Sequence, residues 1–174
     1  MARISYAQLD SPERHRIAEK IISERGALLH LYKMLLNSAP VAEGWLNYLT
    51  AIRHKCKLAG HLREMVIMRV AFINGASYEA DQHAPIALKE GLTQAQIDAL
   101  YDWEIANCFS DQQCAVLAYC DYMTKYVQVP DSIYNTMATY FDDEVIVELT
   151  ATISAYNMVS RFLEALQVHS HDHS

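Results

Sequence analysis

The fold is decided by residues 61–92, which read HLREMVIMRVAFINGASYEADQHAPIALKEGL. This stretch predicts two helical runs joined by residues 74–77 (NGAS). The first run is apolar almost all round, which is typical of a buried central helix. Ser77 is a good N-cap residue and is expected to start the second run.

Two acids and one histidine stand out on these two helices. Glu64 shares one stripe of the first run with apolar residues such as Ile67 and Ala71. Glu79 falls in the first turn of the second run, where the helix dipole favours an acid, and His83 follows one turn later. Glu64, Glu79 and His83 are therefore the candidate catalytic residues.

The short link predicts an antiparallel hairpin in which Glu64 and His83 face each other, offset by about one helical turn. We expect them to line one pocket, with Glu79 near His83. Burial is expected to push the Glu64 carboxyl toward its neutral form, in which it can exchange protons near neutral pH. A structural ion pair in the core is the alternative interpretation of the same residues.

Length and composition predict a single domain over residues 1–168, followed by a flexible histidine-containing tail at residues 169–174. The chain has 174 residues, of which 52% are hydrophobic and 20% charged. This leaves little polar surface for a monomer, so a homo-oligomer is expected.

The net charge, the apolar runs and the N-terminal residues indicate which partners and which cellular location to expect. A net charge of −7 argues against nucleic acid and anionic membrane as partners. The longest apolar run, residues 65–73, contains Arg69 and is too short to span a bilayer. The first residues lack the apolar core of a signal peptide. A cytoplasmic protein is the expectation.

The rest of the chain also has helical periodicity, with helix-start signals at Ser11-Pro12, Thr93 and Ser110. No segment alternates with the period of a strand, so the fold class is predicted to be all-α. The expected further helices are residues 12–25, 28–36, 41–56, 93–104, 110–126, 130–140 and 144–166.

Metal and thiol chemistry are not predicted. The cysteines Cys56, Cys108, Cys114 and Cys120 form no C-x-x-C pair and are expected to be small buried hydrophobic residues. Glu79 and His83 are spaced to share a helix face, but the sequence offers no third metal ligand beside them. No cofactor and no metal are expected.

Several motifs resemble a known family. They are residues 63–67 (REMVI), Asn74, 78–79 (YE), 83–84 (HA) and 91–93 (GLT). This pattern resembles the signature of the carboxymuconolactone decarboxylase family, which is related to the alkylhydroperoxidase D-like (AhpD-like) proteins. The resemblance implies an AhpD-like all-helical bundle with a buried central helical hairpin, assembled as a homo-oligomer.

The family has two branches. The peroxidase branch carries a C-x-x-C on the second central helix, and here both cysteines are missing, so thiol peroxidase activity is not expected. The decarboxylase-like branch keeps a Glu and a His without the thiols, as in this chain. Related members often have an aromatic residue after the Tyr-Glu pair, and Ala80 departs from that pattern.

The resemblance implies a cofactor-free lyase that acts on a small organic acid or lactone by proton transfer. His83 would then donate a proton or bind an oxyanion. Glu64 would orient the reacting groups or relay a proton, and Glu79 would hold His83 or the substrate. A substrate carboxylate would be bound by an arginine, for which the candidates are Arg63, Arg69 and Arg161. The alternative is a non-catalytic helical oligomer that binds a small molecule or a partner.

Overall fold

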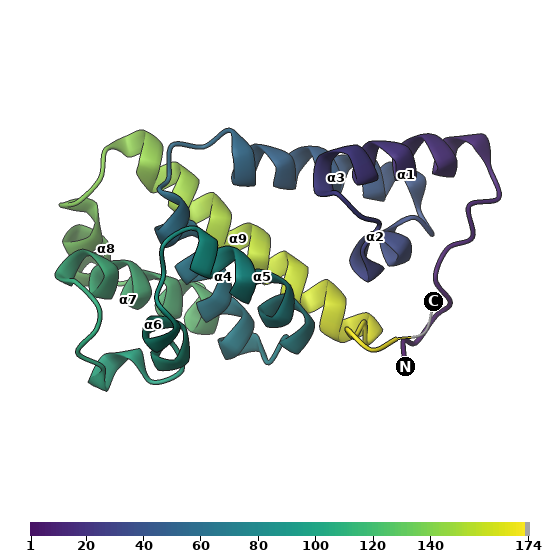
Figure 1. Cartoon of the computed structure of the whole chain (residues 1–174). Helices are drawn as coiled ribbons and strands as arrows, with labels where there is room; N and C mark the ends of the chain where they lie inside the picture. The colour runs from purple at the N-terminus through teal and green to yellow at the C-terminus, as the bar shows by residue number, and fades with distance from the viewer. Residues whose placement is uncertain (173–174) are drawn as a thin grey trace. The chain divides into compact units, whose positions relative to one another are not determined.

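The structure is a computed structural model that describes residues 1–172. Within those residues it consists of α-helices and one 3-10 helix, without a strand, in the order drawn in Figure 1. The prediction of an all-α fold is confirmed. Unit 1 comprises residues 1–55 and the chain from Leu163 onward, and unit 2 comprises Cys56–Phe162. That residues 1–168 fold as one domain stays a prediction.

Unit 1 is built from α1 (Pro12–Arg25), α2 (His30–Leu35) and α3 (Ala39–His54). The Ser11 side chain caps α1 by accepting a hydrogen bond from the Arg14 amide, and Gly26 ends α1 in the left-handed region at φ 81°. Both ends therefore lie where the sequence predicts them. The core of this unit is made by apolar side chains of all three helices, including Ile17, Ile21, Leu31, Leu35, Leu46 and Leu49.

The described part of the predicted flexible tail makes contacts within unit 1. Asp172 accepts hydrogen bonds from the Tyr6 hydroxyl at 2.6 Å and from the His169 amide at 3.1 Å. The flexibility of the tail stays a prediction, and His173 lies outside the described residues.

Unit 2 is organised around the hairpin of α4 (Gly60–Asn74) and α5 (Ser77–Lys89), which Figure 1 shows side by side. Gly75 ends α4 in the left-handed region at φ 68°, a conformation that costs glycine little. Nine side chains of α4 are buried, as expected for a central helix. The N-cap of α5 is Ala76 rather than the predicted Ser77, which is the first residue of the helix and does not cap it.

The rest of unit 2 packs around this hairpin, with α7 against α4. The predicted helix over residues 93–104 ends early, because the chain turns after Ala99 into a 3-10 helix. No helix within residues 1–172 is long and apolar enough to cross a membrane. The remaining elements are α6 (Gln94–Ala99), η1 (Trp103–Ile105), α7 (Asp111–Tyr126), α8 (Asp131–Ala138) and α9 (Asp143–Leu166).

Candidate active site

Glu64 and His83, which come from the two arms of the hairpin, are in direct contact. Glu64 lies in α4 with none of its surface exposed, and His83 in α5 is 7% exposed. The Nδ1 atom of His83 lies 2.7 Å from a carboxylate oxygen of Glu64. The two long side chains therefore close the one-turn offset that the sequence predicts between them.

Glu64 is held as a carboxylate, which corrects the expectation of a raised pKa. Burial alone raises the pKa of Glu64, but hydrogen bonds and positive charge from His83 and Arg63 outweigh burial, and the net pKa lies below its ordinary value. An ionised Glu64 accepts the proton on Nδ1 of His83. This fixes the tautomer of the ring and leaves Nε2 as the nitrogen that can exchange a proton with another molecule.

Glu79 lies one turn before His83 on the same helix and is also buried. It accepts a hydrogen bond of 2.7 Å from the hydroxyl of Ser160, which comes from α9. The ring of Tyr156, one turn before Ser160, meets His83 edge-on with ring centroids 5.0 Å apart.

Ser160 and Tyr156 contact the candidate residues, although the sequence alone did not predict a role for them. One signal was available, because Thr152, Tyr156 and Ser160 place hydroxyl groups at every fourth position of an otherwise apolar helix face. Which helix that face covers is decided by the tertiary structure alone.

Arg63 is the arginine that touches the site. Its Nε atom donates to Glu64 over 3.0 Å, and its Nη2 atom lies 3.2 Å from a carboxylate oxygen of Glu90, the residue that follows α5. A Cβ on Gly60 would lie 1.7 Å from the Glu90 carboxylate, so the absence of a side chain at Gly60 makes room for that group. One guanidinium thus holds a buried carboxylate and a partly exposed one.

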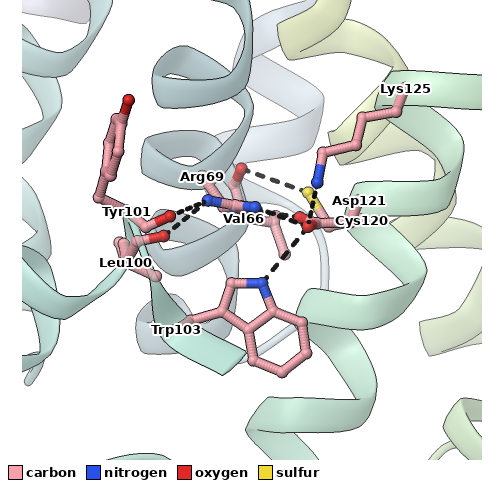
Figure 2. Close-up of polar contacts among 8 residues, drawn as sticks. All are labelled: Val66, Arg69, Leu100, Tyr101, Trp103, Cys120, Asp121 and Lys125. Carbon is pink, nitrogen blue, oxygen red and sulfur yellow. Dashed lines mark hydrogen bonds and ion pairs between the residues drawn. The ribbon is translucent and has the colours of Figure 1, made fainter. Parts of the chain in front are cut away.

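Arg69 has a different role, which Figure 2 shows. Its guanidinium makes two hydrogen bonds of 2.6 Å to Asp121 on α7 and donates to the backbone oxygens of Leu100 and Tyr101 at 2.8 and 2.9 Å. Lys125 also pairs with Asp121 at 2.8 Å. Every edge of the Arg69 guanidinium is used, so this residue ties α4 to α7 and to the chain after α6.

Arg161, the third candidate, lies exposed on α9. It donates to the backbone and side-chain oxygens of Asn157 at 3.0 and 2.5 Å. No contact joins it to Glu64 or His83 among the hydrogen bonds of the described residues.

Comparison with known proteins finds a family match and a shared fold. Residues 39–121 match the carboxymuconolactone decarboxylase family. An uncharacterized peroxidase-related protein from Ralstonia eutropha JMP134, with an alkylhydroperoxidase AhpD core, has a TM-score of 0.84 over 98% of this chain and 93% of its own, at 15% identity. This chain therefore carries a match to the carboxymuconolactone decarboxylase family and has the AhpD-like fold.

One further protein is similar to this chain in sequence and another in structure. The uncharacterized protein YdfG of Bacillus subtilis (strain 168) is 29% identical over 106 residues, which cover 60% of this chain and 72% of YdfG. The debrominase Bmp8 without ligand has a TM-score of 0.80 over 95% of this chain and 90% of its own, at 15% identity. Structural similarity at 15% sequence identity shows a shared AhpD-like fold and nothing finer.

The four cysteines are scattered along the chain. Cys120 is buried as predicted, and burial raises the pKa of its thiol. The same prediction is wrong for Cys108, which is exposed, and only partly right for Cys56 and Cys114, which are half-buried. None of them lies on the α4–α5 hairpin.

Three cavities lie away from the Glu64–His83 pair. Two, of about 490 and 510 Å³, lie in unit 1, and one of about 90 Å³ lies beside Arg69 in unit 2. That Glu64 and His83 line a common pocket stays a prediction. Within residues 1–172, no three His, Cys, Asp or Glu side chains are grouped to hold a metal ion.

Proposed function

We propose that this protein is a cofactor-free lyase that removes carbon dioxide from a small organic acid or lactone by proton transfer through His83. The observation that carries the proposal is the 2.7 Å contact between His83 and an ionised, fully buried Glu64. Such a carboxylate stabilises an imidazolium and orients it, as in other carboxylate–histidine pairs of enzymes. The family match supports the reaction class.

The reaction needs little from the protein. When a carboxylated unsaturated lactone loses carbon dioxide, the carbon–carbon bond breaks and its electron pair moves into the ring carbonyl as a dienolate. The protonated His83 then gives its Nε2 proton to the substrate carbon, and solvent returns a proton to the imidazole ring of His83. Glu64 stays ionised throughout. Glu79, fixed by Ser160, helps to set the position of the substrate or of His83.

Arg63 is the arginine best placed to bind a carboxylate of the substrate. It contacts Glu64 directly, whereas Arg69 is fully used by Asp121 and two carbonyl groups. The Glu90 carboxylate, paired with Arg63 at 3.2 Å and partly exposed, occupies the place that an incoming carboxylate would take. A substrate acid would displace Glu90 into solvent and keep the charge of Arg63 paired.

The test is turnover of a butenolide carboxylic acid, followed by carbon dioxide release and, in heavy water, by deuterium entering the lactone product. We expect His83→Ala to lose at least about a hundredfold in rate while its circular dichroism stays unchanged. His15→Ala, an exposed histidine of α1, is the matched control and should keep full rate. Full activity of the His83→Ala protein contradicts the proposal, and stoichiometric binding without turnover favours the non-catalytic alternative.

The same assay tests Arg63. Arg63→Gln should raise KM about tenfold or more, because one charge-assisted pair with the substrate is lost. Glu90→Gln should lower KM, because Arg63 no longer has a competing carboxylate. Arg16→Gln, in a surface ion pair of unit 1, controls for a change of net charge. An unchanged KM in the Arg63→Gln protein assigns carboxylate binding elsewhere.

A further inference from the structure

The part of α9 that belongs to unit 2 reaches two site residues of α5, which it passes in Figure 1. Ser160 donates a hydrogen bond of 2.7 Å to Glu79. One turn earlier on α9, the ring of Tyr156 lies against the ring of His83. Both pairs of residues are spaced by four, and their order is reversed between the two helices. α9 therefore contacts the site at two successive turns of α5.

Tyr156 is a rigid neighbour for His83. It is 1% exposed and comes from the middle of a long helix. Its ring is perpendicular to the imidazole, with an interplanar angle of 90° and centroids 5.0 Å apart, which is a favoured arrangement of two aromatic rings. Because protein interiors are closely packed, a buried ring in this place leaves the imidazole little room to turn.

Two contacts hold the imidazole, and they come from different helices. Glu64 of α4 lies 2.7 Å from Nδ1, and Tyr156 of α9 packs against the ring. Within residues 1–172, these are the hydrogen bond and the ring contact that reach His83. The hydrogen bond fixes the position of Nδ1, but the ring can still tilt about it, because the second side-chain torsion of histidine has a broad energy minimum. A perpendicular aromatic neighbour resists that tilt.

The direction of Nε2 depends on this tilt. Among the described residues, Nε2 of His83 has no hydrogen-bond partner that would hold it, and in the proposed function it is the atom that exchanges a proton. Proton transfer needs the donor within hydrogen-bond reach of the reacting atom. A misplacement of about 1 Å can cost on the order of a hundredfold in rate.

We propose that Tyr156 is a positioning residue for His83, whose ring fixes the plane of the imidazole and thereby the direction of Nε2. Ser160 supports this role, because its bond to Glu79 keeps α9 in register with α5. The aromatic ring is the part of Tyr156 that acts, and its hydroxyl group is not required. The effect on rate rests on the proposed function, whereas the effect on the imidazole does not.

Nuclear magnetic resonance relaxation of the histidine rings tests the positioning on the full chain without substrate. In wild type and Tyr156→Phe, the order parameter of the His83 ring should stay near the rigid value of about 0.85, and in Tyr156→Leu it should fall below about 0.6. Tyr119→Leu is the matched control, because Tyr119 is a buried tyrosine of α7 whose ring meets Tyr134, and it should leave the His83 ring rigid. Circular dichroism checks the fold, and Tyr156→Met replaces Tyr156→Leu if the leucine protein does not fold.

Steady-state kinetics with a butenolide carboxylic acid give a second measurement. In Tyr156→Leu, kcat should fall about tenfold or more with an unchanged KM, while Tyr156→Phe should keep the wild-type kcat. A His83 ring that stays rigid in Tyr156→Leu overturns the proposal. So does a mobile ring without a loss of kcat, or a Tyr156→Phe protein that loses as much as Tyr156→Leu. If wild type does not turn over the butenolide acid, the proposed function fails, and the order parameter still decides whether Tyr156 positions His83.

Discussion

At the scale of single residues, the proposed function divides the work of proton transfer between Glu64 and His83. Hydrogen bonds from His83 and Arg63 keep Glu64 ionised although it is completely buried. A carboxylate in that state does not deliver protons at neutral pH, so its role is to hold the Nδ1 proton of His83 and to stabilise the ring when it becomes charged. In the proposed reaction, Nε2 of His83 is then the atom that exchanges protons.

This division of roles predicts the behaviour of Glu64→Gln. The amide keeps a hydrogen bond to His83 but cannot stabilise an imidazolium, so kcat should fall at least about tenfold while KM changes little. Steady-state kinetics of both proteins measure this split between kcat and KM. Glu19→Gln, an exposed acid of α1, is the control, and an unchanged kcat in the Glu64→Gln protein would argue for a purely structural Glu64.

At the scale of elements, the buried ion pair between Arg69 and Asp121 holds the central helix to α7. Lys125 also pairs with Asp121, and Arg69 also donates to carbonyl groups after α6, as Figure 2 shows. Burial on its own raises the pKa of Asp121, but the bonds from Arg69 and Lys125 outweigh it and lower the pKa below its ordinary value of 3.8. Arg63 and Arg69 thus lie six residues apart on one helix, with separate partners.

The lowered pKa of Asp121 predicts how acid unfolds the protein. The unfolded carboxyl takes up its proton at a higher pH than the folded one, so this pair stabilises the fold above about pH 4 and the contribution is lost as pH falls further. Asp121→Asn should cost about 3 kcal/mol at pH 7, because it leaves Arg69 buried without its counter-charge.

Thermal unfolding between pH 7 and pH 3 measures this effect. The difference in the free energy of unfolding between wild type and the Asp121→Asn protein should become smaller below pH 4. Asp98→Asn, an exposed acid of α6, should show no such dependence. A gap that stays constant across this range would mean that Asp121 does not contribute as a carboxylate.

At the scale of the whole molecule, the AhpD-like fold is shared with a peroxidase-related protein and a debrominase, but none of the four cysteines of this chain lies on the α4–α5 hairpin. Cys120 is buried with a raised pKa, and burial also raises the pKa of Cys56 and Cys114. A reactive thiol needs the opposite shift, since the thiolate is the nucleophile.

We therefore predict no catalytic turnover of hydrogen peroxide with dithiothreitol as reductant. A variant with Cys56, Cys108 and Cys114 changed to serine and Cys120 changed to alanine should consume peroxide as slowly as wild type. Peroxide consumption by wild type at enzymatic rates, lost in that variant, would refute the prediction.

The sequence by itself determined the helical class, the hairpin and the pairing of Glu64 with His83. These follow from local information: the 3.6-residue period, the glycine at residue 75, and a link too short for anything but antiparallel neighbours. Most helix ends follow for the same reason, since capping residues act within one turn. The helix predicted over residues 93–104 ends early at Ala99. The chain after Ala99 is held by Arg69, which is distant in sequence.

Only the tertiary structure decided what each charged residue meets. Three arginines were equivalent as candidates in the sequence, and contacts across helices separated them: Arg63 to Glu64, Arg69 to Asp121, and Arg161 to solvent and Asn157. The sign of the Glu64 pKa shift was wrong for the same reason. Burial can be read from a pattern, but the balance between desolvation and pairing depends on distances of a few ångströms between residues far apart in the chain.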